Sequence, residues 1–333
     1  MERWMMKADA TSTDELMLEE VPVPEAGPGE VRVKVQAVSL NARDLMVLEQ
    51  RFMRLSDRNL VPASDMSGTI DAVGAGVSEW AVGDHVLNLH FKGWEDGAMP
   101  ADAGGGLGSL DEDGVLAEYV VLSADRIARA PKGYTHAQAA CLPCAAVTAW
   151  NAVMDDHPLA AGDTLLVIGT GGVATSAMLI ARGVGAKIAA LVRSDGKNDR
   201  MREMGIDTIV NSSDTPEWGK AVLEATGGVA KVVNTIGFGA VNQGLSACAY
   251  GGEVALVGLR DQEGPSLVFD LFGKSVRGIT VGSAAMYRAL RDQLETTGET
   301  PVIDDNFVFE RADKALAALK QSGRFGKIVV ELG

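Results

Sequence analysis

The 333-residue chain has little of several features that would mark particular classes of protein. Its three cysteines, Cys141, Cys144 and Cys248, are too few for a disulfide framework, which fits a reducing compartment. No apolar run approaches the roughly 20 residues of a membrane span, and the N-terminus lacks the apolar core of a signal peptide. The sequence therefore predicts a cytoplasmic protein with no membrane partner.

Positive charge is also scarce. The chain has 30 Lys and Arg residues against 45 Asp and Glu residues, a net charge of −15 and a pI near 4.7. Because such a surface repels phosphate backbones, the composition argues against a nucleic-acid partner. Any anionic ligand must be held by a local basic site.

Histidine and cysteine give no clear metal motif. The four histidines are His85, His90, His136 and His157. They show no close i, i+4 pairing, so each is expected to pack or to lie at the surface. The segment Cys141–Cys144 has the C-x-x-C spacing of a redox pair or half a metal site. A structural zinc would need about two more nearby ligands, and only His136 is close.

The most informative pattern present is a buried strand that ends in glycines. Leu165–Ile168 is uniformly apolar, as expected of a parallel strand covered on both faces. The turn that follows consists of Gly169, Thr170, Gly171, Gly172 and Val173. Such a turn lets the backbone approach a pyrophosphate, and the N-terminus of the next helix supplies N–H donors. The pattern predicts a dinucleotide site.

The pattern of strands changes along the chain. Up to about Tyr134 it is β-rich: Glu30–Ala37, for example, alternates apolar and polar residues. From Thr135 onward, apolar runs alternate with helical segments, which predicts an α/β fold with a parallel sheet of about six strands. The last of these runs is Ile279–Val281. Beyond it we expect two helices and a terminal strand, Lys327–Leu332, that returns to the first domain.

We therefore predict two domains. The first covers residues 1–134 and is completed by residues 283–333, and the second covers residues 135–282. The glycine-rich, acidic stretch 103–114 is expected to be a mobile surface loop, or a lid over the site.

Five motifs are shared with one known family. They are Val73–Asp84 (VGxGVxxxxxGD), Leu142–Asn151, Gly169–Ala174 (GxGGVx), Arg277–Ser283 and Arg324–Val329. On these motifs the whole chain resembles the medium-chain dehydrogenase/reductase superfamily, specifically its zinc-free quinone oxidoreductase-like branch. The resemblance implies a GroES-like β-rich catalytic domain, a Rossmann doubly wound NADP-binding domain, and a homodimer through the strand near Ile279–Val281.

The resemblance also predicts that no metal is bound. Zinc alcohol dehydrogenases of this superfamily hold a catalytic zinc with a cysteine, a histidine and a second cysteine. The corresponding positions here are Asn41, Ser64 and Cys144, so one ligand of about three remains. The stretch 91–114, where those relatives have four clustered cysteines, has none.

The end of the second strand of the α/β domain predicts NADPH. NAD-specific folds place Asp or Glu there to bind the ribose, but the strand ends at Val192 and continues with Arg193 and Ser194. Arg193 offers paired donors for a 2′-phosphate, and Ser194 and Lys197 could add others. The alternative takes Asp195 as the ribose acceptor and restores NAD.

Further cofactor contacts are implied by the resemblance alone. They are Asn41, Thr148, Gly237, Val257, Gly258, Ser283 and Lys327. Two have equally simple structural explanations: Thr148 could cap or pack a helix, and Lys327 could be a surface charge.

The expected chemistry is hydride transfer from NADPH to a quinone, an enone or a related carbonyl compound. Without zinc, alcohol oxidation loses its electrophile, whereas reduction of a conjugated substrate needs less help. Candidate catalytic residues are Asn41, Asp44 and Tyr119, although Asp44 could simply pair with Arg43.

Three alternatives remain open. They are a catalytically weak NADPH-binding protein, an NAD(P)-dependent alcohol dehydrogenase-like enzyme, and an S-adenosylmethionine methyltransferase, which Val192 disfavours.

Overall fold

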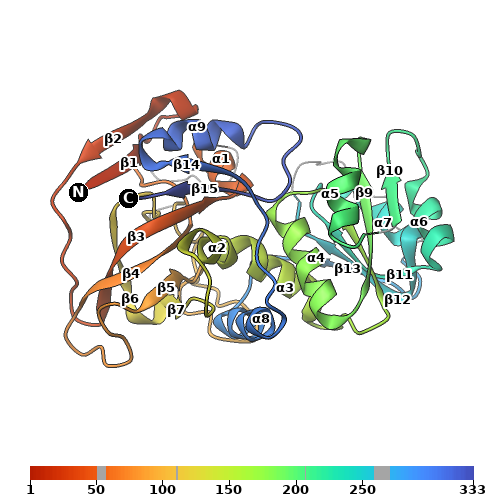
Figure 1. Ribbon diagram of the computed structural model, residues 1–333, viewed down its shortest axis with the longest axis horizontal. Helices are drawn as coiled ribbons and strands as arrows, with labels where there is room; N and C mark the ends of the chain where they lie inside the picture. Colours follow the sequence, from red (N-terminus) through yellow and green to blue (C-terminus); the bar gives the residue numbers. More distant parts are fainter. Residues whose placement is uncertain (51–57, 110–111, 207, 259–270) are drawn as a thin grey trace.

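The computed structural model describes residues 1–50, 58–109, 112–206, 208–258 and 271–333. Figure 1 shows two sheets side by side, a β-rich domain that holds both chain termini and an α/β domain. Among the described residues, no helix has the length and apolar character needed to cross a membrane.

The β-rich domain is built on a seven-stranded sheet in the described part of the chain. Its order is β14 (Ile303–Val308), β15 (Lys327–Glu331), β3 (Glu30–Leu40), β4 (Asp65–Val73), β5 (His85–Asn88) and β7 (Ile127–Arg129), and β6 (Tyr119–Ser123) also pairs with β3. A separate antiparallel pair joins β1 (Glu2–Met6) to β2 (Leu16–Glu20). The period-2 pattern of β3 is confirmed: Val31, Val33 and Val35 are at most 1% exposed.

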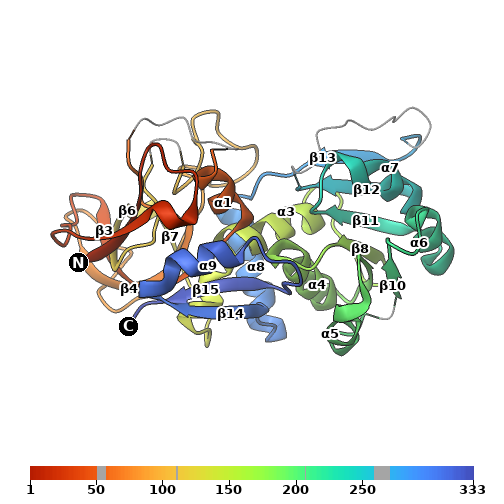
Figure 2. The ribbon, with the colours of Figure 1, turned by 90° about the horizontal axis from the view of Figure 1, so that it is seen from above.

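The last strand returns to the first domain, as predicted. β15 pairs antiparallel with β3, and β14 lies parallel to β15 on its other side. Figure 2 shows these C-terminal strands beside the N-terminal sheet. β15 is thus an interior strand of a sheet that begins about 300 residues earlier in the chain.

The α/β domain has a six-stranded sheet in which every described pair is parallel. Its order is β10 (Thr208–Asn211), β9 (Lys187–Val192), β8 (Thr164–Ile168), β11 (Val229–Asn234), β12 (Cys248–Leu256) and β13 (Ser275–Gly278). The predicted fold class, a GroES-like β-rich domain with a Rossmann domain, is confirmed.

Both faces of this sheet are buried. Leu165 and Val167 of β8 belong to one apolar core, whereas Leu166 and Ile168 belong to another on the opposite face.

The α-helices of the described residues are α1 (Ala42–Leu48), α2 (His136–Ala140), α3 (Val147–Met154), α4 (Gly172–Val184), α5 (Asn198–Glu203), α6 (Trp218–Thr226), α7 (Val241–Ala247), α8 (Ala284–Thr297) and α9 (Ala312–Ala318). Shorter turns are η1 (Thr13–Glu15), η2 (Ala124–Arg126), the π-helical η3 (Leu142–Ala146), η4 (Asp195–Lys197), η5 (Phe238–Ala240) and η6 (Phe309–Arg311).

Two strands differ from the sequence analysis. The last strand of the parallel sheet is Ser275–Gly278, not the apolar run Ile279–Val281. Its Arg277 donates hydrogen bonds to Asn151 and Glu253, so an edge strand is held by polar contacts that an apolar pattern does not reveal. The strand β14, with the acidic sequence IDDNFV, was not expected for the same reason.

The strand order fixes where a ligand can bind. From β8 the strand order first runs outward through β9 and β10 to one edge, and then from β11 through β12 and β13 to the other edge. The order of the strands therefore switches between β8 and β11. In sheets of this kind the ligand crevice opens at the carboxyl ends of the strands at this switch.

Candidate functional site

The predicted glycine turn lies at this crevice, between β8 and α4. Gly169 has φ +99°, and a Cβ there would lie 2.8 Å from Thr235 Oγ1, so the fold itself requires glycine. Gly171, the residue before α4, has φ −77°, and a Cβ there would meet no atom within 4 Å. The space over the N-terminus of α4 is therefore open, as a bound phosphate would need.

The C-terminal segment crosses the same turn. Gly326 N donates to Thr170 O at 2.9 Å, and Thr170 Oγ1 donates to Arg324 O at 2.8 Å. A Cβ on Gly172 would lie 2.4 Å from Lys327 Cδ. The two domains thus meet where the cofactor is predicted to bind, and Lys327 lies directly against the turn.

Lys327 is a buried cation, not a surface charge. Its side chain is 4% exposed, and its Nζ donates to Leu40 O at 2.9 Å and to Asn41 Oδ1. Nζ also lies 4.0 Å from Asp65 Oδ2. Asn41 Nδ2 donates to Ser64 Oγ, which donates to Asp65 Oδ1 at 2.8 Å. The carboxyl end of β3 therefore holds an ammonium group in a fixed polar network.

Asp44 lies in the first turn of α1 beside this network. Its Oδ2 accepts the Asn41 N–H at 2.8 Å, and Arg43 donates to its Oδ1 at 3.4 Å. Burial raises the pKa of Asp44 to about 6, with Arg43 opposing the shift and the charge of Asp65 adding to it. A carboxyl with this pKa is a suitable proton donor near neutral pH.

The raised pKa of Asp44 predicts that its ionisation lowers the free energy of unfolding. Because the folded protein binds this proton more tightly than the unfolded chain, this loss of stability is absent below about pH 4 and complete above about pH 6. Asp44→Asn should therefore gain stability relative to wild type between pH 4 and pH 7, by at most about 3 kcal/mol. Denaturant unfolding at both pH values measures the gain. The exposed Asp199→Asn variant is the control, and an equal gain there would contradict the assignment.

Two predicted cofactor contacts have their hydroxyl groups occupied. Thr148 Oγ1 donates to Cys144 O at 2.7 Å within its own helical segment. Ser283 is the N-cap of α8, and its Oγ accepts the Met286 N–H at 3.2 Å. Both residues are buried, so each has a structural role in the free protein.

The glycines predicted at later strand ends do come together. Asn234 ends β11, and its carbonyl accepts the N–H groups of Val257 and Gly258, both at 3.0 Å. Its side-chain Oδ1 accepts the Gly237 N–H at 3.1 Å. These residues form a second stretch of the crevice, continuous with the glycine turn through Thr235, whose hydroxyl donates to Ile168 O.

Lys197 reaches back from η4 to the glycine turn. Its Nζ donates to Thr170 Oγ1 at 2.5 Å and to Arg324 O at 2.9 Å. Partial burial lowers its pKa from the usual value. The structure therefore places a second cation at the turn, close to where a dinucleotide would lie.

The end of β9 presents a basic, polar surface. Val192 is buried, whereas Arg193 and Ser194 are exposed. Asp195, the alternative ribose acceptor, already accepts hydrogen bonds from Asn198 and Asn211 through Oδ1, at 3.1 and 3.3 Å.

Tyr119 is not brought to the site. It lies on β6 opposite Lys34 of β3, and the Arg32 guanidinium lies 5.6 Å from its ring centroid. Asn41 lies beyond the other end of β3, about 23 Å away at the rise of a strand.

The sequence analysis kept Cys144 as one potential metal ligand but missed two others, Asp65 and His90. The potential ligand atoms of the three residues, an oxygen, a nitrogen and a sulfur, all lie within 4.8 Å of one another. Burial lowers the pKa of His90 well below its usual value, and burial raises the pKa of the Cys144 thiol to about 12. The prediction of a metal-independent protein is therefore not supported. That prediction considered Ser64 and not its neighbour Asp65. His90 comes close to Asp65 and Cys144 only in the folded chain.

The glycine-rich stretch is packed in its described part, contrary to the expected mobile surface loop. Leu107 and Ser109 are at most 2% exposed. Arg43 donates to Leu107 O at 2.9 Å and to Gly105 O at 3.1 Å. Residues 110 and 111 lie outside the described part.

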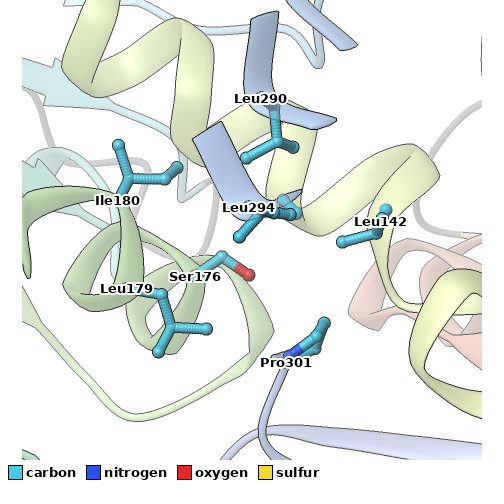
Figure 3. A pocket seen from close by; sticks show the side chains of 8 residues that line it. Leu142, Ser176, Leu179, Ile180, Leu290, Leu294 and Pro301 are labelled. Atoms are coloured by element: carbon cyan, nitrogen blue, oxygen red, sulfur yellow. The ribbon is translucent and has the colours of Figure 1, made fainter. Parts of the chain in front are cut away.

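A small cavity lies elsewhere in the α/β domain. Figure 3 shows side chains of η3, α4 and α8 around it, and Ser176 is the only polar residue among the described residues that line it. The lining contains none of the groups around Lys327. The cavity is best explained as a packing gap.

The fold and the crevice are those of a two-domain protein with a dinucleotide site. Comparisons with known sequences identify the class as an NAD(P)-dependent oxidoreductase. The profile of the alcohol dehydrogenase GroES-like domain matches residues 27–132, and that of the zinc-binding dehydrogenases matches residues 172–296. The chain belongs to the medium-chain dehydrogenase/reductase superfamily.

Some of its relatives bear the name of zinc-type alcohol dehydrogenase-like proteins, and others are polyketide synthases. One of the former, from Schizosaccharomyces pombe, is 33% identical, over 99% of each chain. The crystal structure of a putative alcohol dehydrogenase from Sinorhizobium meliloti 1021 is 38% identical over 99% of each chain, with a TM-score of 0.91. An NAD-dependent alcohol dehydrogenase is 31% identical over all of both chains, with a TM-score of 0.89. The predicted quinone oxidoreductase branch is not specifically supported.

Proposed function

We propose that this protein transfers hydride between NADPH and the carbonyl group of a small molecule. The observation that carries the proposal is the buried Lys327 ammonium, which lies against the glycine turn. Hydride addition to a carbonyl leaves negative charge on oxygen, and a fixed cation in a water-poor site stabilises that charge. Asp44, with its raised pKa, is the candidate proton donor.

Two substrate classes suit this site. The relatives named as alcohol dehydrogenases or alcohol dehydrogenase-like proteins favour an aldehyde or ketone paired with its alcohol. A quinone or enone is the second candidate, because Asn41 and Ser64 stand where the zinc enzymes of the superfamily have ligands.

Stopped-flow measurement of NADPH oxidation with aldehydes, ketones, quinones and enones would separate these candidates. We expect turnover with one class to exceed the other by at least about tenfold. Tight NADPH binding without turnover of any of them would instead support a binding protein with a structural or sensing role.

The preference for NADPH is part of the proposal. Arg193 and Ser194 are exposed after β9, Lys197 lies at the turn, and the rival acceptor Asp195 is engaged. The NAD-dependent relative leaves NADH as the competing cofactor.

Arg193→Ala should raise the KM for NADPH by about 10- to 100-fold, the usual worth of a charge-assisted hydrogen bond. The KM for NADH should change less than about threefold, because NADH has no 2′-phosphate. Steady-state kinetics with both cofactors measures this. Arg202→Ala, on exposed α5, is the control. An unchanged cofactor preference in Arg193→Ala would rule out this role.

A further inference from the structure

Three side chains of different chemistry meet beside Lys327. Asp65 begins β4, His90 follows β5, and Cys144 lies in η3. Their potential ligand atoms are a carboxylate oxygen, an imidazole nitrogen and a sulfur, all within 4.8 Å of one another. This donor set matches the preferences of Zn²⁺ and related transition-metal ions.

His90 supplies an independent sign of a missing ligand. Its side chain is 2% exposed, and its Nδ1 is buried with no hydrogen-bond partner among the residues that the structure describes. Asp65 Oδ1 lies 4.0 Å away, too far for a hydrogen bond. An unpartnered buried polar atom is unfavourable and calls for an explanation.

The His90 ring is held in this position from several sides. The Phe91 ring packs edge-on at 4.7 Å, and a Cβ on Gly106 would lie 2.4 Å from His90 Nε2. The His90 carbonyl accepts a hydrogen bond from Arg126 at 2.8 Å. The free nitrogen therefore faces Asp65 because of the packing around it.

We propose that Asp65, His90 and Cys144 form a binding site for a divalent transition-metal ion, most simply Zn²⁺. The set differs from the positions that the family resemblance assigns, Asn41, Ser64 and Cys144, and shares only Cys144 with them. Three protein ligands leave a fourth position open, as in catalytic zinc sites.

The geometry is close to what such an ion needs. Zinc–ligand bonds of roughly 2.0–2.3 Å in a tetrahedron require ligand separations of about 3.3–3.8 Å. Any two of the three atoms must therefore draw together by at most about 1.5 Å, which side-chain rotation can supply. Asp65 is already oriented, since its Oδ2 accepts the Cys144 N–H at 3.0 Å.

Lys327 opposes the ion. Its ammonium lies 4.0 Å from Asp65 Oδ2, so the two cations compete for one carboxylate. We therefore expect the ion to bind more tightly when this charge is removed. Only a role of the ion in catalysis rests on the proposed function. Because metal binding is measured without turnover, the metal site and the proposed function can be refuted independently.

The test uses metal-free, full-length protein titrated with Co²⁺ and followed by absorption, then displaced with Zn²⁺. One equivalent of Co²⁺ should give a thiolate-to-cobalt charge-transfer band and the visible bands of four-coordinate cobalt. His90→Ala and Cys144→Ser should each weaken binding by at least about a hundredfold, more than the loss of an outer-shell partner. Lys327→Met should tighten it by at least about tenfold.

His157→Ala, at an exposed position, should bind Co²⁺ like wild type. Far-UV circular dichroism reports whether each variant folds. If His90→Ala does not fold, the nearly isosteric Cys144→Ser decides the matter through loss of the charge-transfer band. Absence of a stoichiometric ion, or binding unaffected by both substitutions, would overturn the site.

Discussion

Replacing Gly171 with valine is expected to weaken the binding of NADPH and NADH alike by about a hundredfold or more. A Cβ at this position would meet no atom of the described residues within 4 Å, so the valine side chain would start into open space over the N-terminus of α4. A bound phosphate would use that space and the free N–H groups there. Loss of one or two charge-assisted hydrogen bonds, each about 1.5–3 kcal/mol, accounts for the magnitude.

Stability separates this prediction from simple misfolding. Since the Cβ of valine at this N-cap position would meet none of the described atoms within 4 Å, the melting temperature should fall by no more than a few degrees. Fluorescence titration with both cofactors measures affinity, and thermal denaturation measures stability. Gly278→Val, on edge strand β13 and equally free of contacts, should bind cofactor normally. Normal binding by Gly171→Val would show that no phosphate lies over this helix.

Replacing Lys327 with methionine is expected to lower kcat by about 10²- to 10³-fold, the usual effect of losing one group that stabilises an oxyanion. The methionine side chain fills similar space but supplies no positive charge near Asn41 and Asp65. Affinity for NADPH should change only a few-fold. Stopped-flow hydride transfer and separate cofactor titration distinguish the two effects.

The control is Lys320→Met, which removes an exposed lysine paired with Glu49 and should leave kcat unchanged. Because Lys327→Met leaves the buried Asp65 without its nearest cation, the variant could unfold. The double variant Lys327→Met/Asp65→Asn removes both buried charges. If it folds, its kcat still reports the effect of losing the Lys327 ammonium. Retention of wild-type kcat in a folded variant would assign Lys327 a structural role only.

The parts of the fold predicted best are those fixed by local pattern. The strand β8, the glycine turn and α4 follow from apolar runs and backbone requirements within about 20 residues. The edge strands β13 and β14 could not be found in this way. Their polar side chains are satisfied by distant partners, as when Arg277 donates to Asn151 and Glu253.

The site was predictable only where a motif carried it. Lys327 lies in the motif Arg324–Val329, whereas Asn41 came from a zinc-ligand position implied by the resemblance and Asp44 was a candidate catalytic residue near it. The fold joins the three through hydrogen bonds at the end of β3. His90 has no neighbouring ligand in sequence, so no spacing rule could find it. Its relation to Asp65 depends on the pairing of β4 with β5.

The return of β15 to the first sheet has a consequence for synthesis of the protein. β15 lies between β14 and β3, and the same segment supplies Lys327 and the Gly326 contact to the glycine turn. A ribosome-bound chain can form the parallel sheet early, but the first sheet lacks this interior strand until residues 327–331 have been synthesised, about 300 residues after β3. Removal of residues 327–333 should therefore abolish cofactor-dependent turnover and leave a chain whose exposed β3 edge favours aggregation.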